Sequence, residues 1–169
     1  MNYEAINLLL FNGKISQSQK EGIEAIMAEF NKRFTDKRWL AYILATAYHE
    51  TGKKMQPVTE LGGENYLKSK KYYPYYGRDL CQTTWLANYE NVKAFTGVDV
   101  VSNPELIKDL KIASQVIVEF MNKGYYTGKK LSHYFDATVN DPINARRIIN
   151  GTDKAALIAS YYDTFRSAL

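Results

Sequence analysis

Cysteine is almost absent from this sequence: Cys81 is the only one among 169 residues. A single cysteine cannot form an intramolecular disulfide, so the fold must be held by packing and hydrogen bonds. A lone cysteine next to aromatic residues is more often a small buried hydrophobic side chain than a nucleophile. This composition is typical of a protein that folds in a reducing cytoplasm.

Long apolar runs and a strong charge of one sign are also lacking. No run approaches the length of about 20 residues that a transmembrane helix needs, so we expect no stable membrane insertion. The start of the chain, Met1–Glu4, lacks the basic segment of a secretory signal, so we expect no signal peptide. The net charge of +4 favours an anionic surface, but no nucleic-acid motif accompanies the basic cluster Lys68–Lys71. We therefore expect no nucleic-acid partner.

The length predicts one domain, residues 1–169, large enough to bury a sizeable core. Apolar residues recur at helical spacing through most of the chain, which predicts a mainly α fold. The predicted helices begin near the following capping or starting residues: Asn2, Ser16 or Ser18, Thr35 or Asp36, Leu86, Asn103, Asp141, and Thr152 or Asp153. In the last helix the side chains predicted to face inward are Leu157, Ile158, Tyr161, Tyr162 and Phe165.

One long segment, from Gly52 to Pro74, loses the helical period. Its glycines and prolines predict a long loop or a small hairpin. Loops of this length in a compact domain are usually functional or disordered. Because this one carries the carboxylates of Glu60 and Glu64, we interpret it as functional.

The central predicted helix places Glu50 just after an apolar segment, Trp39–Tyr48, that we expect to be buried. At 100° per residue, Glu50 falls about 20° from Trp39, on the same stripe as Ile43 and Ala47. A carboxylate on that stripe loses water, which raises its pKa and favours the protonated form that a general acid needs. Gly52 would end the helix, so that Glu50 opens toward a cleft. The alternative is that Glu50 is simply the first solvated residue at a helix end.

Several short motifs occur in order along the chain, and together they resemble the family 19 glycoside hydrolases, which include plant-type chitinases and phage endolysins. These motifs are His49-Glu50-Thr51-Gly52, Tyr76-Gly77-Arg78, Gln82-Thr83-Thr84-Trp85, Asn88-Tyr89 and Arg147-Ile148-Ile149-Asn150-Gly151. The endolysin branch is the better match, because the chain is short and nearly free of cysteine. The resemblance covers residues from about Ser16 to the C-terminus and implies a lysozyme-like, two-lobed fold.

The resemblance also implies hydrolysis of β-1,4 bonds between N-acetylated amino sugars, without a metal or a cofactor. In this family the Glu of His-Glu-Thr is the general acid, which is Glu50 here, and a second carboxylate activates water with inversion. We prefer Glu60 over Glu64 for that second role. The hydroxyl at Thr84 corresponds to the group that holds the attacking water. The substrate-binding residues that the resemblance implies are His49, Glu64, Tyr76, Arg78, Gln82, Asn88 and Asn150.

Two positions depart from the family pattern. Asp79 stands where the family usually has glycine, and Thr83 stands where an apolar residue is usual. Asp79 is therefore a third candidate for the base, or a cause of altered pH dependence. Trp85, Ile148 and Ile149 are predicted to pack in the core.

The sequence predicts a monomeric endolysin that acts on peptidoglycan glycan strands as a muramidase. We expect it to stay in the host bacterial cytoplasm until it is released to the wall and periplasm. Three alternatives remain open: a chitinase on the same scaffold, a lytic transglycosylase, and a non-catalytic module that binds the cell wall or disrupts membranes.

Overall fold

Helices make up the regular structure of the computed structural model, which describes residues 1–169. Their bounds are α1 (Tyr3–Leu10), α2 (Gln17–Asn31), α3 (Lys37–Glu50), α4 (Glu64–Lys68), α5 (Leu86–Thr96), the 3₁₀ helix η1 (Pro104–Lys108), α6 (Leu110–Lys123), the 3₁₀ helices η2 (Leu131–His133) and η3 (Asn144–Ile148), and α7 (Ala155–Ala168). The predicted mainly α fold is confirmed. The only β-bridge is isolated and pairs Phe135 with Asn140, and the predicted loop after α3 contains no strands.

Local capping rules explain where most helices begin. The side chain of Asn2 accepts a hydrogen bond from the amide of Ala5, and Asp36 accepts one from the amide of Arg38. Ser16 and Gln19 form a capping box at the start of α2. At the other end of a helix, Gly124 follows α6 with φ of 80°, a conformation that costs glycine little.

The predicted cap of the last helix is wrong. Neither Thr152 nor Asp153 caps α7; the preceding residue is Lys154, with φ of 58° and no side-chain cap. The reason is tertiary, because the carbonyl oxygen of Asp153 accepts a hydrogen bond from the Nε of Arg146 at 2.9 Å. The turn is held by that contact, and the helix begins only after it. Leu157, predicted to face inward, is instead 42% exposed.

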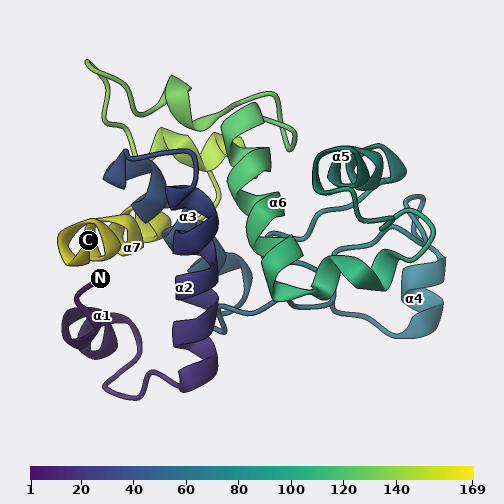
Figure 1. Ribbon diagram of the computed structural model, residues 1–169, viewed down its shortest axis with the longest axis horizontal. Helices are drawn as coiled ribbons and strands as arrows, with labels where there is room; N and C mark the ends of the chain where they lie inside the picture. Colours follow the sequence, from purple (N-terminus) through teal and green to yellow (C-terminus); the bar gives the residue numbers. More distant parts are fainter.

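Two hydrophobic clusters divide the molecule into two lobes (Figure 1). Helices α1, α2, α3 and α7 form the larger lobe, in which α3 packs against α7 and both chain ends lie close together. Helices α4 and α5 lie in the smaller lobe, and α6 runs between the two. The residues of the smaller cluster are Tyr89, Val92, Val100, Ile107, Val116 and Phe120.

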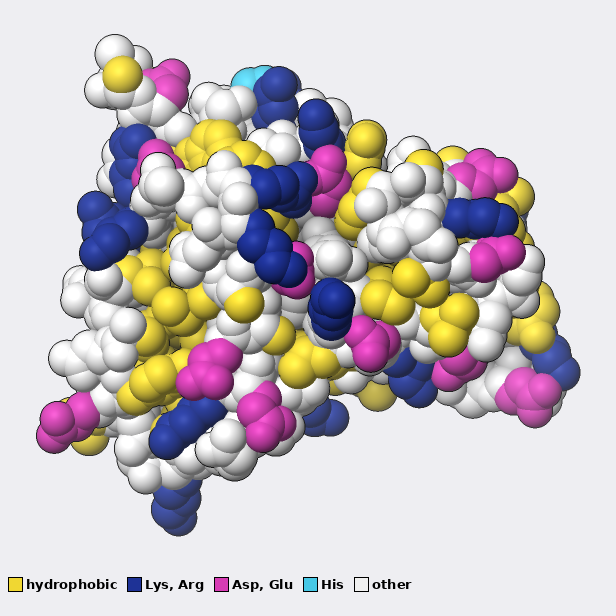
Figure 2. Space-filling view, in the orientation of Figure 1, with side chains coloured by type: hydrophobic (Ala, Val, Ile, Leu, Met, Phe, Trp, Pro, Cys, Tyr) yellow, Lys and Arg dark blue, Asp and Glu magenta, His cyan; other side chains and the backbone are white.

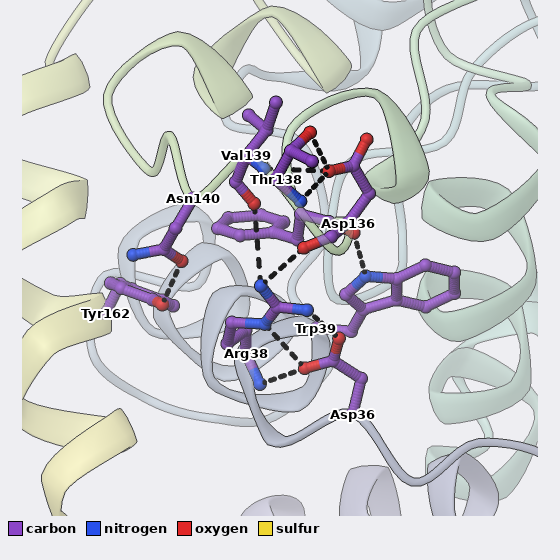
Figure 3. Close-up of polar contacts among 9 residues, drawn as sticks. Asp36, Arg38, Trp39, Asp136, Thr138, Val139, Asn140 and Tyr162 are labelled. Atoms are coloured by element: carbon purple, nitrogen blue, oxygen red, sulfur yellow. Dashed lines mark hydrogen bonds and ion pairs between the residues drawn. The ribbon is translucent and has the colours of Figure 1, made fainter.

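The start of α3 is tied to the segment between η2 and η3 by a polar network (Figure 3). Arg38 binds the carboxylate of Asp36 at 2.6 Å and donates to the carbonyl oxygen of Asp136 at 2.9 Å. The indole nitrogen of Trp39 donates to the carbonyl oxygen of Phe135 at 3.0 Å. These contacts satisfy backbone groups of an irregular segment and fix it against the helix that carries Glu50 at its other end.

One face of the larger lobe carries an apolar patch between α2 and the chain ends (Figure 2). A groove of about 350 Å³ lies there, and its apolar lining consists of Met1, Met27, Phe30, Phe34, Leu40 and Leu169. None of the helices combines the length and the hydropathy that crossing a lipid bilayer requires.

Candidate functional site

Glu50 is the last residue of α3 and follows nine consecutive buried residues, Leu40–Tyr48. Its side chain is 18% exposed, and Arg146 lies against it with Nη1 at 2.5 Å from Oε1. The Arg146 side chain is only 4% exposed and donates a second hydrogen bond, to the carbonyl oxygen of Asp153. The helix therefore ends with a carboxylate that is mostly removed from water and held by a buried guanidinium.

The sequence did not indicate Arg146 as a partner of Glu50. It predicted an apolar environment for this carboxylate, and a buried cation lies there instead. The two residues are 96 positions apart. The only available signal was the Arg146-Arg147 pair that precedes Asn150-Gly151, and nothing local distinguishes which arginine turns inward. In the structure Arg147 is the exposed one.

We expect Arg146→Gln to lower the free energy of unfolding by about 3 kcal/mol, because it leaves a mostly buried carboxylate without its partner. The exposed neighbour provides the matched control, and Arg147→Gln is expected to change stability by less than about 0.5 kcal/mol. Urea unfolding of both variants measures the difference. Equal stabilities would show that the Glu50–Arg146 pair is not a structural element of the fold.

Glu60 lies in the loop after α3, and its carboxylate has two donors. The hydroxyl of Tyr72 donates to Oε1 at 2.7 Å, and the amide of Gly77 donates to Oε2 at 3.3 Å. Burial and this hydrogen bond to Glu60 raise the pKa of Tyr72 to about 12, so the phenol remains a donor at neutral pH. The amide of Glu60 in turn donates to the carbonyl oxygen of Gly77 at 2.7 Å. Glu60 is thus positioned by both its backbone and its side chain.

Glu50 and Glu60 line the same pocket, which has a volume of about 820 Å³. The residues that line it are His49, Glu50, Thr51, Gly52, Lys54, Pro57, Val58, Thr59, Glu60, Leu61, Tyr66, Gln82 and Lys108. The end of α3 supplies one part of this lining, the following loop a second part, and η1 of the smaller lobe contributes Lys108. Four of the residues predicted from the sequence therefore share one pocket: His49, Glu50, Glu60 and Gln82.

Gln82 and His49 both border the carboxylates. Gln82 has φ of 59°, and its Nε2 donates to the carbonyl oxygen of Val58 at 2.6 Å. Gly77 makes this position possible, because a Cβ there would lie 2.5 Å from Oε1 of Gln82. Burial lowers the pKa of His49, which favours its neutral form.

Six predicted site residues do not line this pocket: Glu64, Tyr76, Arg78, Thr84, Asn88 and Asn150. Glu64 is exposed and paired with Lys68 at 2.5 Å on the short helix α4. Asn150 is exposed, whereas Thr84 and Asn88 are half-buried and joined by a hydrogen bond from the Asn88 amide to the Thr84 carbonyl oxygen. The structure therefore separates Glu64 from Glu60 by placement as well as by burial.

Arg78 is buried and fully occupied by contacts within the smaller lobe. Its Nε lies 2.6 Å from a carboxylate oxygen of Glu105, and its guanidinium lies 3.4 Å from the ring centroid of Tyr76. It also donates to the hydroxyl of Tyr89 and to the carbonyl oxygen of Pro74. These contacts hold the side chain of Arg78 within the smaller lobe, and it does not line the pocket.

Asp79 is 1% exposed and does not line the pocket. One carboxylate oxygen accepts hydrogen bonds from the amides of Cys81 at 3.1 Å and Thr83 at 2.9 Å, and the other has no partner. Burial raises the pKa of Asp79 above its usual range. A carboxylate in this position organises the turn that carries Gln82 and does not reach a substrate in the pocket.

Asp79→Asn is expected to become progressively more stable than the natural protein as the pH rises from about 4. The folded-state pKa of Asp79 lies above the unfolded value of about 3.9, so the natural protein loses stability as the pH rises through this range. Asn keeps one acceptor and cannot ionise. Urea unfolding between pH 4 and pH 8 measures the difference. Asp79→Ala, the control, cannot ionise either but also lacks the acceptor, so it should be about 1–3 kcal/mol less stable than Asp79→Asn at every pH. A pH-independent difference between Asp79→Asn and the natural protein would contradict the prediction.

No group of three or more His, Cys, Asp or Glu side chains is placed to hold a metal ion. Cys81 is buried, and burial raises its pKa well above the usual value. Its thiol is therefore kept in the neutral form, which suits the packing role that the sequence predicted for it.

Comparison with protein-family models and with curated proteins gave no match. Solved structures do match. A bacterial family 19 chitinase superposes with a TM-score of 0.71 and 24% identity, covering 99% of this chain and 93% of that one. Chitinase C from Streptomyces griseus HUT6037 has a TM-score of 0.69 and 21% identity, covering 98% of this chain and 74% of that one.

The class IV chitinase of family GH19 from Zea mays has a TM-score of 0.65 and 18% identity, and the match covers 99% of this chain and 91% of that one. With identities between 18% and 24%, these similarities establish the fold. The chain has the lysozyme-like fold of the family 19 chitinases, as the resemblance predicted.

Proposed function

We propose that this protein is a glycoside hydrolase that cleaves β-1,4 bonds in a polymer of N-acetylated amino sugars. More specifically, we propose a muramidase that cuts peptidoglycan between N-acetylmuramic acid and N-acetylglucosamine. The observation that carries the proposal is the shared pocket of Glu50 and Glu60, in the fold of the family 19 chitinases. Most glycoside hydrolases use a pair of Asp or Glu carboxylates that flank the scissile bond.

In the proposed mechanism Glu50 protonates the leaving oxygen and Glu60 takes a proton from the attacking water. Glu50 ends a rigid buried helix, and Arg146 orients its carboxylate. Glu60 is oriented by the hydroxyl of Tyr72 and the amide of Gly77. Attack from the face opposite to the leaving group inverts the anomeric carbon. Thr84, which lies outside the pocket lining, is proposed to hold the water, as the family resemblance implies.

One unpaired lysine in the pocket lining favours peptidoglycan over chitin as the substrate. Lys54 lines the pocket and is exposed without a carboxylate partner, whereas Lys108, which lines it from the smaller lobe, is paired with Glu105 at 3.2 Å. Chitin is uncharged, whereas the peptide stems of peptidoglycan carry carboxylates. The unpaired ammonium of Lys54 would bind a carboxylate of an anionic polymer and would find no such partner on a neutral one.

A chitinase is the second candidate. The similar structures named above are described as chitinases, and the fold is shared with them along almost the whole chain. Both activities use the same two carboxylates and differ in the sugar accepted next to the scissile bond. The pocket geometry supports the common reaction, and the substrate distinguishes the two candidates.

Mass spectrometry of the products decides between them. Purified peptidoglycan sacculi and chitin oligosaccharides are incubated separately with the protein. New reducing N-acetylmuramic acid ends are the expected result. Reducing N-acetylglucosamine ends from sacculi would indicate a glucosaminidase, and cleavage of chitin alone would indicate a chitinase. Release of no fragments from either polymer would refute the proposal and favour a non-catalytic wall-binding or membrane-disrupting module.

The biological setting that we propose is that of a phage endolysin. In this role a monomer accumulates in the host bacterial cytoplasm and is released to the wall, where cleavage of glycan strands lyses the cell. This part of the proposal is supported by the near absence of cysteine and the motif resemblance.

A further inference from the structure

Trp85 is not a core residue, which corrects the packing predicted from the sequence. Its side chain is 50% exposed, and it precedes the first residue of α5 with φ of 75°. A bulky residue rarely adopts a left-handed conformation, and tryptophan side chains are highly buried on average. Ile148, by contrast, is buried as predicted, and Ile149 packs against the core. Both features at Trp85 are unfavourable for folding, and they suggest a role in binding.

The indole is connected to the pocket through Tyr72. The rings of Trp85 and Tyr72 meet edge to face, with centroids 5.4 Å apart and planes at 70°. The hydroxyl of Tyr72 donates to Glu60 at 2.7 Å. The amide of Trp85 donates to the carbonyl oxygen of Tyr75 at 2.9 Å, which fixes the backbone beneath the ring. One aromatic ring therefore separates the exposed indole from the carboxylate proposed as the base.

A second exposed aromatic residue, Tyr66, already has a cation against one face of its ring. Tyr66 lines the pocket and is 48% exposed, and the ammonium of Lys70 lies 3.9 Å from its ring centroid. This cation occupies one face of the phenol ring. No lysine or arginine lies over the indole of Trp85, so its exposed area is available to a ligand.

We propose that Trp85, supported by Tyr72, forms a sugar-stacking subsite on the Glu60 side of the site, outside the pocket that the two carboxylates line. The ligand is a pyranose ring of a β-1,4-linked N-acetylated amino sugar, one or more units away from the scissile bond. The C–H groups on one face of such a ring are apolar and pack on an aromatic face, as on an indole. The subsite rests on the proposed function, because it assumes that the glycan continues from the pocket.

Fluorescence titration tests this subsite without depending on turnover. The protein has two tryptophans, and Trp39 is half-buried in the larger lobe. Trp39→Phe combined with Glu50→Gln leaves Trp85 as the single reporter in a protein that is not expected to cleave its ligand. Addition of an N-acetylglucosamine hexamer is expected to change the Trp85 emission. An unchanged emission over a range in which calorimetry detects binding would overturn the subsite.

Calorimetry with the same hexamer, in the Glu50→Gln background, measures the contribution of the ring. Trp85→Ala is expected to weaken binding about tenfold, whereas Trp85→Phe should stay within about threefold of the parent because it keeps an aromatic face. Leu86, the neighbouring residue, is 42% exposed and provides the matched control. Leu86→Ala is expected to bind like the parent; equal binding by Trp85→Ala would refute the proposal.

Kinetics separates a subsite from a merely structural role. On long glycan, Trp85→Ala with Glu50 intact should raise KM about tenfold with little change in kcat. A fall in kcat at unchanged KM would mean that Trp85 only supports Tyr72 and Glu60, which contradicts the subsite. Hydrolysis by the natural protein is measured in parallel. If it cleaves neither polymer while Trp85→Ala still weakens binding, the proposed function fails and the subsite stands.

Discussion

Glu50→Gln is expected to lower kcat for glycan hydrolysis by about 10²- to 10⁴-fold. Gln has nearly the same shape as Glu but cannot deliver a proton to the leaving oxygen. The side chain sits at the end of a buried helix, next to a buried guanidinium, where water cannot readily replace it as the acid. The measurement is the rate of release of reducing ends from purified sacculi at saturating substrate, so that the change is assigned to kcat.

The control for Glu50→Gln removes a carboxylate of the same type from a surface helix. Glu90 is exposed on α5, and Glu90→Gln should retain the natural kcat within about twofold. Unfolding of Glu50→Gln in urea must accompany the assay, because the substitution also alters the contact with Arg146. A folded Glu50→Gln protein with the natural kcat would remove Glu50 from the mechanism.

Glu60→Gln is expected to lower kcat by a similar factor, about 10²- to 10⁴-fold, if Glu60 is the base that activates water. The amide cannot accept the proton, although it can still accept the hydrogen bond from Tyr72. Glu64→Gln is the matched control, since Glu64 lies in the same region of the chain but is exposed and paired with Lys68. We expect Glu64→Gln to retain kcat within about twofold. Rates on sacculi, with product analysis, measure both variants.

Other results for Glu60→Gln and Glu64→Gln would point to a different base or to a different reaction. A large loss in Glu64→Gln with a functional Glu60→Gln would move the role of the base to Glu64 and would require α4 to turn toward the pocket. If both variants keep full activity and the products end in anhydro sugars, the reaction is that of a lytic transglycosylase, which needs a single acid.

The sequence predicted the parts of this molecule that depend on neighbouring residues. The mainly α fold, the buried run of α3 that ends at Glu50, and the caps at Asn2 and Ser16 all follow from patterns within one turn or a few. Gly124 ends α6 for the same local reason. The order of the motifs also predicted the fold that the solved chitinases confirm.

The tertiary structure decided which distant side chains meet. Arg146 reaches Glu50 across 96 positions, and it also displaces the start of α7 by binding the carbonyl oxygen of Asp153. Asp79, considered as a base from its place in the motif, turns inward to hold the turn at Cys81 and Thr83. Trp85, expected in the core, is turned outward by a backbone conformation that no local preference of tryptophan favours.

The physical reason for this division is the range of the interactions. Helix periodicity and capping depend on residues within about four positions, so they can be read from a single sequence. The partner of a buried charge and the direction of a loop side chain depend on which elements pack together, and different packings of the same helices would satisfy the same local patterns. The sequence by itself therefore determined most of the helices and the place of Glu50, and only the folded chain decided what surrounds its carboxylate.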